Sequence, residues 1–505
     1  MQNLLKHILR IILITLSGSI SAQNKPVVTV VDADRLTYEK DLVDAQRLLG
    51  NVVLKYDDAY LQCDSAYLYA TQDFDAFGQV RINQGDSLFL TGKSLHFDKE
   101  TAVASMRESI RLKNQDITLT TDALDYNLDD NIAHFWGGGK IVNPENKNTL
   151  TSQSGVYDVN SGRFRFKDDV KLSNPDYTVY ADTLVYSDVA EKAWFLGPTD
   201  IHTRDADIYC ENGWFDTRTQ WCQFSESAVI TTGSTTMQGD SIIYNGESGF
   251  GEIFCNVLIS DTTSNYVISG DYGWHDQAHG KSFVTERALM TQVFDQDSLT
   301  LHADTLLAMK DSSGHQNIHA YHGVRFFKPD LQGVADSLVY SESDSLLTMY
   351  HNPILWSEEN QIIGDTIQIL TYGGAIQKLF VFKNSFISSE ALPGNYNQIK
   401  GKHLTGYFSN NALRRVEVIG NGQVVYFPLD ESDPDAAKII GVNNAECSSL
   451  NIYVNQNRIE RVSLLDKPSG ALHPNSIATA SDKTLKGFVW VTNRRPLSIA
   501  DLFRK

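Results

Sequence analysis

The sequence has little of several features that mark common protein classes. Proline is scarce, at 12 of 505 residues, and 43 basic residues face 62 acidic ones, for a net charge of −19. This excess of negative charge repels phosphate backbones, so nucleic acid is not expected as a partner. After residue 22 no apolar stretch reaches the ~18 residues of a membrane helix. A hydrophobic content of 42% nevertheless predicts a folded chain.

Cysteines are few, and the usual catalytic motifs are missing. The five cysteines are odd in number and include no CxxC pair, which argues against a metal cluster or a complete disulfide framework. GxSxG, HExxH and Walker motifs are absent, so we predict no enzymatic activity, no catalytic residue and no cofactor. His315, His319 and His322 have a spacing like that of metal ligands. On a strand, however, His319 and His322 face opposite ways, and no metal site is predicted.

The N-terminus has the pattern of a signal peptide over residues 1–22. Lys6, His7 and Arg10 precede the apolar run Ile11 to Leu16, and small residues follow, which places cleavage after Ala22. A retained anchor is the alternative. No cysteine lies near the predicted cleavage site, which argues against a lipoprotein. We therefore expect an exported, soluble mature chain.

A short phrase recurs along the chain: a small residue, usually an acid, and then two alternating apolar positions. It is clear in ADRLTY at Ala33, TDALDY at Thr121 and ADTLVY at Ala181. The fourteen copies begin at Ala33, Cys63, Gly92, Thr121, Ser152, Ala181, Cys210, Gly239, Gly270, Ala303, Ala335, Gly364, Gly401 and Ala445.

The spacing of these copies is regular. Successive copies are 30, 29, 29, 31, 29, 29, 29, 31, 33, 32, 29, 37 and 44 residues apart. The first position is small in every copy, so Cys63 and Cys210 are expected to be small buried residues and not reactive thiols. The second position is acidic in eleven copies. A short acidic side chain there can hold nearby backbone N–H groups.

Alternation with period two predicts strands throughout the mature chain. A second alternating segment lies between copies, usually after a Gly, Asn or Asp turn signal, as in GNVVLKY at Gly50 and DDVKLS at Asp168. One ~29-residue unit cannot bury an apolar face alone, whereas stacked units can. We predict an all-β fold: an elongated β-jellyroll or folded-sheet body of about fourteen repeats over residues 23–465, as one straight body or with a bend or split.

Residues 466–505 are predicted to form a C-terminal cap and basic tail. GFVWV from Gly487 has the pattern of a closing strand. From Lys483 onward six basic residues accompany one acid, Asp501. This charge suits a polar cap or, alternatively, a tail that docks on an acidic partner or a lipid surface.

The phrase aDxLxY, followed about 15 residues later by GxVxL and repeated near every 29 residues, resembles the OstA-like repeat of the LptA and LptD lipopolysaccharide-transport family. The resemblance covers roughly residues 30 to 465. It implies a periplasmic protein with an apolar groove for acyl chains, and lipopolysaccharide or a related glycolipid as ligand. It also implies partners among transport components at the inner and outer membranes, and head-to-tail self-association. The 40 residues after residue 465 are too few for the barrel of the outer-membrane subunit.

Within this interpretation the alternating apolar residues of the phrase line the groove. The predicted lipid-binding residues are Leu36, Tyr38, Leu95, Phe97, Leu124, Tyr126, Leu184, Tyr186, Ile242 and Tyr244. The alternative is that the same residues fill a sealed core, as in a structural or adhesive β-solenoid. A polysaccharide-degrading solenoid would need clustered acids or bases on one outer face, and the sequence shows one acid per repeat instead.

Overall fold

A computed structural model describes residues 27–39, 43–56, 59–84, 88–114, 117–144, 147–158, 160–173, 175–187, 189–216, 218–294, 298–373, 375–409, 412–430, 438–455 and 458–504. These residues are almost entirely β-strand, which confirms the predicted all-β folded sheet. The predicted signal peptide, residues 1–22, lies outside the described residues. The chain forms two compact units. Unit 1 runs to Gly233 and includes Gln238–Glu247, and unit 2 consists of Ser234–Met237 and Ser248 onward.

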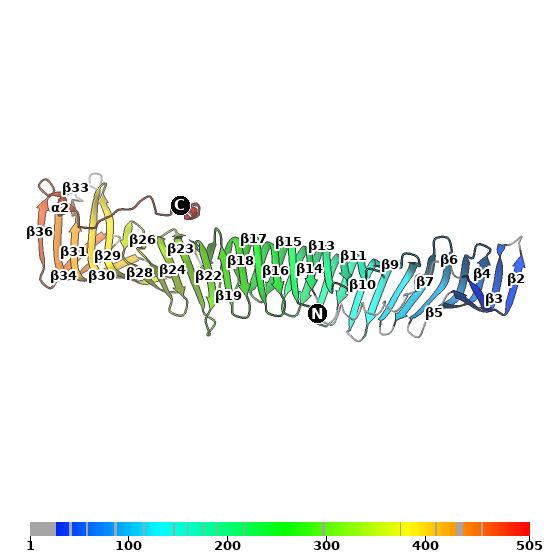
Figure 1. Ribbon diagram of the computed structural model, residues 1–505. Helices are drawn as coiled ribbons and strands as arrows, with labels where there is room; N and C mark the ends of the chain where they lie inside the picture. Colours follow the sequence, from blue (N-terminus) through cyan, green and yellow to red (C-terminus); the bar gives the residue numbers. More distant parts are fainter. Residues whose placement is uncertain are drawn as a thin grey trace. The chain divides into compact units, whose positions relative to one another are not determined.

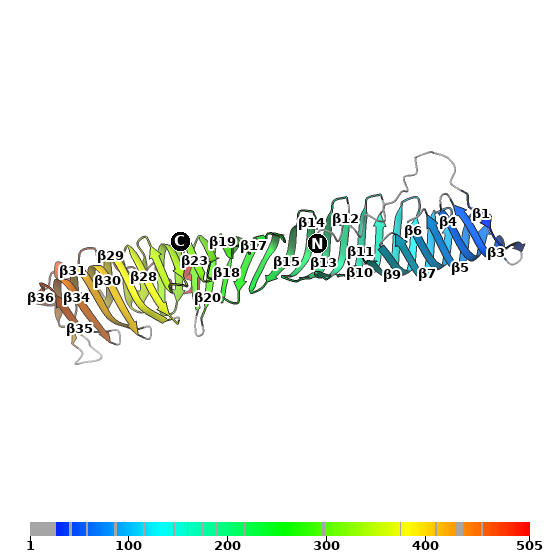
Figure 2. The same ribbon diagram turned by 90° about the horizontal axis from the view of Figure 1, so that it is seen from below.

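In each unit the strands follow one another in sequence order, as Figures 1 and 2 show. The strands up to the boundary of unit 1 are β1 (Thr29–Asp32), β2 (Arg35–Glu39), β3 (Val43–Tyr56), β4 (Ala59–Tyr69), β5 (Phe74–Gln84), β6 (Leu88–Asp98), β7 (Val103–Asn114), β8 (Ile117–Asn127), β9 (Ile132–Asn143), β10 (Asn148–Asp158), β11 (Arg163–Ser173), β12 (Tyr177–Ser187), β13 (Lys192–Thr203), β14 (Asp207–Asp216), β15 (Trp221–Thr232) and β16 (Thr235–Asn245), whose first residues belong to unit 2.

Unit 2 continues with the same alternation and ends in short helices. Its elements are β17 (Phe250–Asp261), β18 (Tyr266–Asp276), β19 (Lys281–Thr285), β20 (Leu289–Val293), β21 (Ser298–His302), β22 (Thr305–Lys310), β23 (Gln316–Lys328), β24 (Leu331–Ser341), β25 (Leu346–Tyr350), β26 (Ile354–Ser357), β27 (Asn360–Ile363), β28 (Thr366–Tyr372), β29 (Ala375–Leu392), β30 (Asn395–Ser409), β31 (Ala412–Tyr426), β32 (Leu429–Asp430), β33 (Lys438–Ile439), β34 (Gly441–Asn455), β35 (Arg458–Leu465), β36 (Ser469–Pro474), the α-helix α2 (Ala480–Lys483) and the 3-10 helix η1 (Ile499–Phe503).

Most repeats consist of two antiparallel strands that bend near the middle; in unit 2 some of these strands are divided at the bend, as β19 and β20 are opposite β18. The ladder between β3 and β4 shows the pattern: pairs run from Tyr56↔Ala59 to Val52↔Cys63, skip two residues, and resume at Leu49↔Ser65. The strand halves before each phrase form what we call the first layer, and the halves that contain its apolar residues form the second layer. The bends between them are the corners.

Most corners are made by two consecutive residues with positive φ on the strand between phrases; at the corner of β13 only Gly197 has positive φ, since Pro198 follows it. Gly50 and Asn51 have φ of 72° and 44°, and Asp168 and Asp169 have φ of 63° and 52°. This left-handed conformation is open to glycine and, among other residues, favours Asn and Asp. The sequence predicts turns between strands at these positions. That prediction was wrong, because the strand continues through the bend.

The second residue of the phrase lies over the corner of a neighbouring strand. A Cβ on Gly50 would lie 2.2 Å from Asp34 Oδ2. Glycine at this position therefore allows both the positive φ of the corner and the close approach of the Asp34 side chain. Asp122 Oδ1 accepts a hydrogen bond from the Ser109 N–H at 3.1 Å, as expected for an acid that holds backbone groups. Where the phrase has a lysine, Lys93, the corner carries the acid, and Lys93 Nζ lies 2.9 Å from Glu108 Oε2.

The corners also correct the position of the last repeat. The phrase pattern puts the fourteenth copy at Ala445, but the ladder skips residues between Ile419↔Ser449 and Gly422↔Cys447. The corner Gly420–Asn421 therefore lies opposite Cys447 and Ser448. The copy begins two residues later than predicted, with serine in place of the acid.

Turns in the second layer are held by a column of Asp and Asn side chains at the ends of the phrase strands. Asp98 Oδ1 accepts hydrogen bonds from the N–H groups of residues 100 and 101 at 2.8 and 3.0 Å. One repeat later Asn127 Oδ1 accepts hydrogen bonds from the N–H groups two and three residues ahead of it, and two repeats later Asp158 Oδ1 does so as well. Such side-chain bonds to the backbone define tight turns and set the length of each repeat.

The C-terminal segment after β36 runs back over the first layer of unit 2 toward β23, as the red trace in Figure 1 shows. We call residues 475–504 the strap. Leu485 packs on Phe386, Val425, Phe427 and Val442. Val491 packs on a second buried cluster, Val334, Ile354 and Trp356. GFVWV is not a strand here, so that prediction was wrong.

Side-chain amides hold the strap in place of a β-ladder. Gln361, 1% exposed, donates Nε2–H to the Val489 carbonyl at 2.7 Å and accepts from the Val491 N–H at 2.8 Å. Gln398 makes the same two bonds, with the Lys483 carbonyl at 2.9 Å and the Leu485 N–H at 2.8 Å. Three residues before their phrases, Gln332 and Asn444 occupy equivalent positions and contact Arg495 and the Asp482 carbonyl. The four amides form a column.

We predict that Gln361→Leu loosens the strap. It leaves the Val489 carbonyl and the Val491 N–H without their partner, which costs about 1–3 kcal/mol for a buried polar group. Trypsin should then cut at Lys486 and Arg494 faster than in the parent chain, as measured by mass spectrometry of limited digests. Gln368→Leu, on β28 with its amide 3.4 Å from Thr348 Oγ1, is the control and should leave the digestion rate unchanged. Equal rates in both variants and the parent would contradict the role of the amide column.

Candidate lipid-binding interior

The two layers face each other with their apolar sides, and the space between them is the candidate site. Tyr56 at the end of the first-layer half of β3 lies 5.3 Å, between ring centroids, from Phe97 in the second layer. The corners close one side of this interior. The opposite side, where the turns of the two layers face each other, we call the mouth.

The first layer of unit 1 contributes an unbroken row of aliphatic side chains, one from each of thirteen consecutive strands. Each member is the cross-strand partner of the next, which brings the side chains into contact range. This aliphatic row consists of Leu54, Leu61, Ile82, Leu90, Leu112, Leu119, Ile141, Leu150, Leu172, Val179, Ile201, Ile208 and Ile230.

The second layer contributes two further rows that include six of the ten predicted residues. Leu95, Leu124 and Leu184 belong to one row. In the other, aromatic residues alternate with alanine at both ends of the row, and three aromatic residues follow one another at its centre, where the rings of Tyr157 and Phe164 stack. This second row consists of Phe97, Ala104, Tyr126, Ala133, Tyr157, Phe164, Tyr186, Ala193 and Phe215.

The predicted residues differ in their burial. Leu95, Phe97, Leu124, Leu184, Tyr186, Ile242 and Tyr244 are buried, and Tyr126 is half-buried. Burial raises the pKa of the Tyr126 and Tyr244 hydroxyls, so both rings stay uncharged. Leu36 and Tyr38 are 55% and 54% exposed, because among the described residues β2 pairs only with β3.

Part of the aliphatic row is accessible to solvent. Ile82, Leu90, Leu112 and Leu119, on β5 to β8, are only half-buried, whereas Ile141 and Leu150 on the next two strands are buried. The interior of unit 1 is therefore most open at β5 to β8.

In unit 2 a group of polar side chains crosses the interior near the mouth. Lys310 Nζ in the second layer lies 3.2 Å from Asp261 Oδ2 in the first, and the Asp261 side chain is 1% exposed. His275 Nδ1 lies 2.9 Å from Ser282 Oγ, and burial lowers the His275 pKa. Tyr266 is buried nearby, which raises its pKa to about 12. We call these five residues the polar crossbar.

Histidines 315, 319 and 322 do not converge. His315 lies in a turn 3.7 Å from Asp311 Oδ2, His319 contacts the Tyr321 hydroxyl at 3.2 Å, and His322 is at a corner 3.4 Å from Asp336. Within the described ranges no group of three or more metal-ligating side chains occurs. In the same ranges, no helix combines the length and apolar character that a membrane span requires.

Comparison with known families matches two regions of the chain. Residues 25–182 match the OstA-like protein family, and residues 293–373 match the LptA/(LptD N-terminal domain) LPS transport protein family. These two regions of the chain are therefore OstA/LptA-like.

Other comparisons add little to this assignment. A search of curated proteins gave no match. Among solved structures, the chain is similar to LptH, the LptA homologous periplasmic component of the conserved lipopolysaccharide transport device from Pseudomonas aeruginosa. The two are 14% identical over 29% of this chain and 81% of that chain, with a TM-score of 0.14.

Sequence reasoning from this OstA/LptA-like repeat found the second-layer residues but missed the first-layer row. A signal for that row exists, because an apolar residue stands two positions before most phrases, as Leu61, Leu90 and Leu119 do. The polar crossbar has no comparable signal. Asp261 and Lys310 are 49 residues apart, which is longer than one repeat.

The buried cysteines generate a testable prediction. Burial raises the pKa of Cys63 to about 11 and that of Cys210 to about 12, so neither forms a thiolate near neutral pH. Cys222 and Cys447 are buried as well, and Cys255 is exposed. Ellman's reagent should therefore titrate one thiol in the native protein and five after unfolding. Reaction of two or more native thiols would contradict this burial pattern.

A second prediction concerns the pH dependence of the polar crossbar. Burial pushes the pKa of Asp261 upward, but the Ser264 N–H and the Lys310 ammonium outweigh it, so the pKa lies below its ordinary value. A carboxyl with a lowered pKa stabilises the fold above its unfolded pKa of ~3.9, and this contribution is lost as the pH falls through the folded value.

Hydrogen exchange provides a local measurement. The Thr263 and Ser264 amides donate to Asp261 Oδ1 at 2.9 and 2.8 Å. At neutral pH Asp261→Asn should raise their exchange rates relative to the parent. The difference should shrink below about pH 4. A difference that does not depend on pH would show that the Asp261 charge contributes nothing.

Proposed function

We propose that the chain carries lipopolysaccharide or a related glycolipid through the periplasm toward the outer membrane, with the acyl chains between the two layers and the sugars in water. The observation that carries the proposal is the aliphatic row, which presents one branched apolar side chain on every strand from β3 to β15. The match of residues 293–373 to an LPS transport protein family and of residues 25–182 to the OstA-like family supports the same ligand.

The energetics suit a carrier. Each buried CH₂ of an acyl chain contributes ~0.8 kcal/mol. Because the aliphatic row repeats from strand to strand, the free energy of a bound chain differs little between neighbouring positions. A lipid can therefore shift along the row without a large barrier. No step of this function needs a chemical reaction, so we propose a non-enzymatic role.

The half-buried stretch at β5 to β8 is the proposed place where acyl chains enter unit 1. Elsewhere in the row Ile208 is half-buried and the other members are packed, with Leu150 3% and Ile230 0% exposed, so at those members a lipid must displace side chains or part the layers. Ile82, Leu90, Leu112 and Leu119 already contact solvent, and covering them with an acyl chain is favourable.

The proposal extends to location and partners. Export with cleavage near Ala22 places the chain in the periplasm, with the further transport components at the two membranes as partners. Strands at the ends of such sheets offer unpaired backbone groups, which can pair with another copy or with a component of the same fold.

A sealed structural or adhesive solenoid is the second candidate. The packing of the interior favours it, because most residues of the three rows are nearly inaccessible. The two candidates differ in whether lipid reaches the interior.

Photocrosslinking separates them. A photoreactive residue replaces Leu119 on the inner side of β8, and in the control it replaces Arg165 on β11, which is exposed on the outer side of the second layer. Purified protein is irradiated with lipopolysaccharide, and adducts are detected by gel shift and mass spectrometry. A carrier gives adducts at Leu119 and few at Arg165. Equal labelling at both positions, or none at Leu119 in folded protein, would contradict the carrier function and favour the sealed solenoid.

A further inference from the structure

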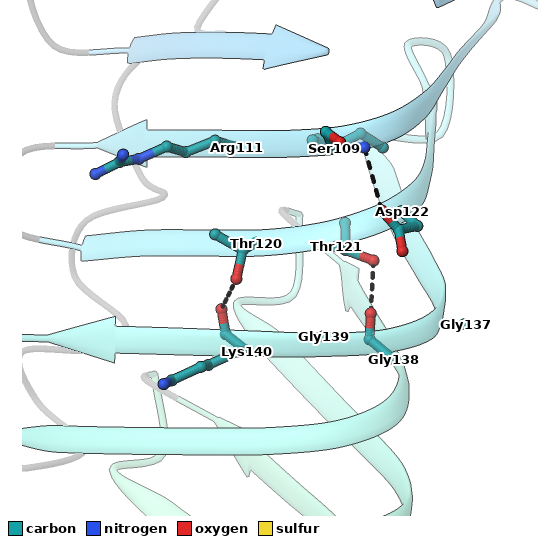
Figure 3. A pocket seen from close by; sticks show the side chains of 10 residues that line it. Ser109, Arg111, Thr120, Thr121, Asp122, Gly137, Gly138, Gly139 and Lys140 are labelled. Carbon is teal, nitrogen blue, oxygen red and sulfur yellow. Dashed lines mark hydrogen bonds between the residues drawn. The ribbon is translucent and has the colours of Figure 1, made fainter. Parts of the chain in front are cut away.

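The outer face of the first layer of unit 1 carries a row in which cations and threonines alternate. Each member is the cross-strand partner of the next, so the row crosses seven consecutive strands. Figure 3 shows its central part, with Arg111, Thr120 and Lys140 on neighbouring strands. We call this set the cation–threonine row: Arg81, Thr91, Arg111, Thr120, Lys140, Thr151 and Lys171.

The charge of this face is opposite to that of the chain. The first-layer halves of β4 to β12 contain no acidic residue among those described, although the chain has a net charge of −19. The four cations of the row are exposed, and the structure pairs none of them with a carboxylate within the described ranges. Arg81 donates to Gln79 Oε1 at 3.3 Å, and Lys171 Nζ lies 5.1 Å from the Tyr180 ring centroid.

A hollow opens beside the centre of the row. It has a volume of about 580 Å³ and is lined by Arg111, Thr120 and Lys140 together with corner residues. The hollow exists because the corner of β9 is built from glycine: a Cβ on Gly137 or Gly138 would have no atom within 4 Å. The carboxylate of Asp122 lies on the corner side of the hollow and bonds the Ser109 N–H.

The spacing of the row selects among anionic ligands. Cations stand on every second strand, so neighbouring positive charges are ~9.6 Å apart along the row. This distance is close to the length of an extended disaccharide and is longer than the separation of successive phosphates in a nucleic acid. Between the cations, threonine offers a hydroxyl for sugar hydroxyls and a methyl group for the apolar face of a sugar ring. At the end of the row Tyr180, 44% exposed, provides an aromatic face.

We propose that the cation–threonine row binds a linear acidic glycan that bears one carboxylate per disaccharide. The glycan lies across the strands, its carboxylates on Arg81, Arg111, Lys140 and Lys171, and a ring substituent occupies the hollow beside Gly137 and Gly138. This site is on the outer side of the sheet, opposite the aliphatic row. It therefore goes beyond the proposed lipid transport and does not depend on it.

The test uses a hyaluronan octasaccharide, which carries one carboxylate in each of its four disaccharides, and isothermal titration calorimetry on the mature chain. Arg111→Gln/Lys140→Gln removes the two central charges. Arg165→Gln/Lys167→Gln removes two exposed charges from the second-layer half of β11 and serves as the control with the same net charge. The row variant should bind at least about tenfold more weakly than the parent, and the control should stay within about twofold. Circular dichroism checks that both variants fold.

The other outcomes overturn the proposal. Equal weakening in both variants would assign the binding to overall charge, and failure of the parent to bind the octasaccharide would remove the ligand class. If vesicles of anionic phospholipid bind the parent in a row-dependent manner while the octasaccharide does not, the row is a membrane contact. Equal affinity for a neutral chito-oligosaccharide of the same length would show that the cations are not used.

Discussion

The corner, a pair of consecutive left-handed residues inside a strand, is the constraint on which the architecture depends. Without it each strand would continue straight and one flat sheet would expose its apolar side. With it most strands enter both layers, while others such as β19 end at the corner, and the two layers enclose an interior. A left-handed conformation costs a non-glycine residue ~1–2 kcal/mol. An acid over the corner supplies contacts that offset this cost: Asn51, with a φ of 44°, donates Nδ2–H to Asp34 Oδ2 at 3.0 Å.

The sequence was sufficient to predict the repeat period, the all-β class and the second-layer side chains, because all three follow from one phrase with period-two alternation. It was not sufficient for the corners. Gly50–Asn51 and Asp168–Asp169 have the composition of hairpin turns, since both structures need positive φ. Only the ladder, which continues on both sides of the bend, distinguishes the two.

The strap and the polar crossbar were beyond sequence reasoning for a different reason. Both depend on residues distant in the sequence that meet only after the layers form, such as Gln361 with Val489 and Asp261 with Lys310. Buried glutamines at equivalent repeat positions are visible in the sequence. The groups that they bind, however, are backbone N–H and carbonyl groups of the strap, which every residue type except proline carries, so the sequence does not reveal them.

The interior and the outer face of unit 1 have different chemistry on the same strands. On β8, Leu119 belongs to the aliphatic row and Thr120 to the cation–threonine row. Alternation thus gives one short half-strand two surfaces, one suited to acyl chains and one to charged, hydroxyl-rich ligands.

The variation among corner pairs has a consequence for folding. Stacked repeats of nearly equal length can pair with the wrong neighbour, a known source of misfolding in repeat proteins. Here Asp34 meets Asn51, Lys93 meets Glu108 and Asp271 meets Arg287, so each contact has its own chemistry. A strand that skipped one repeat would bring acid against acid or leave a charge unmatched. The contacts at the corners thus also favour pairing of each strand with its correct neighbour.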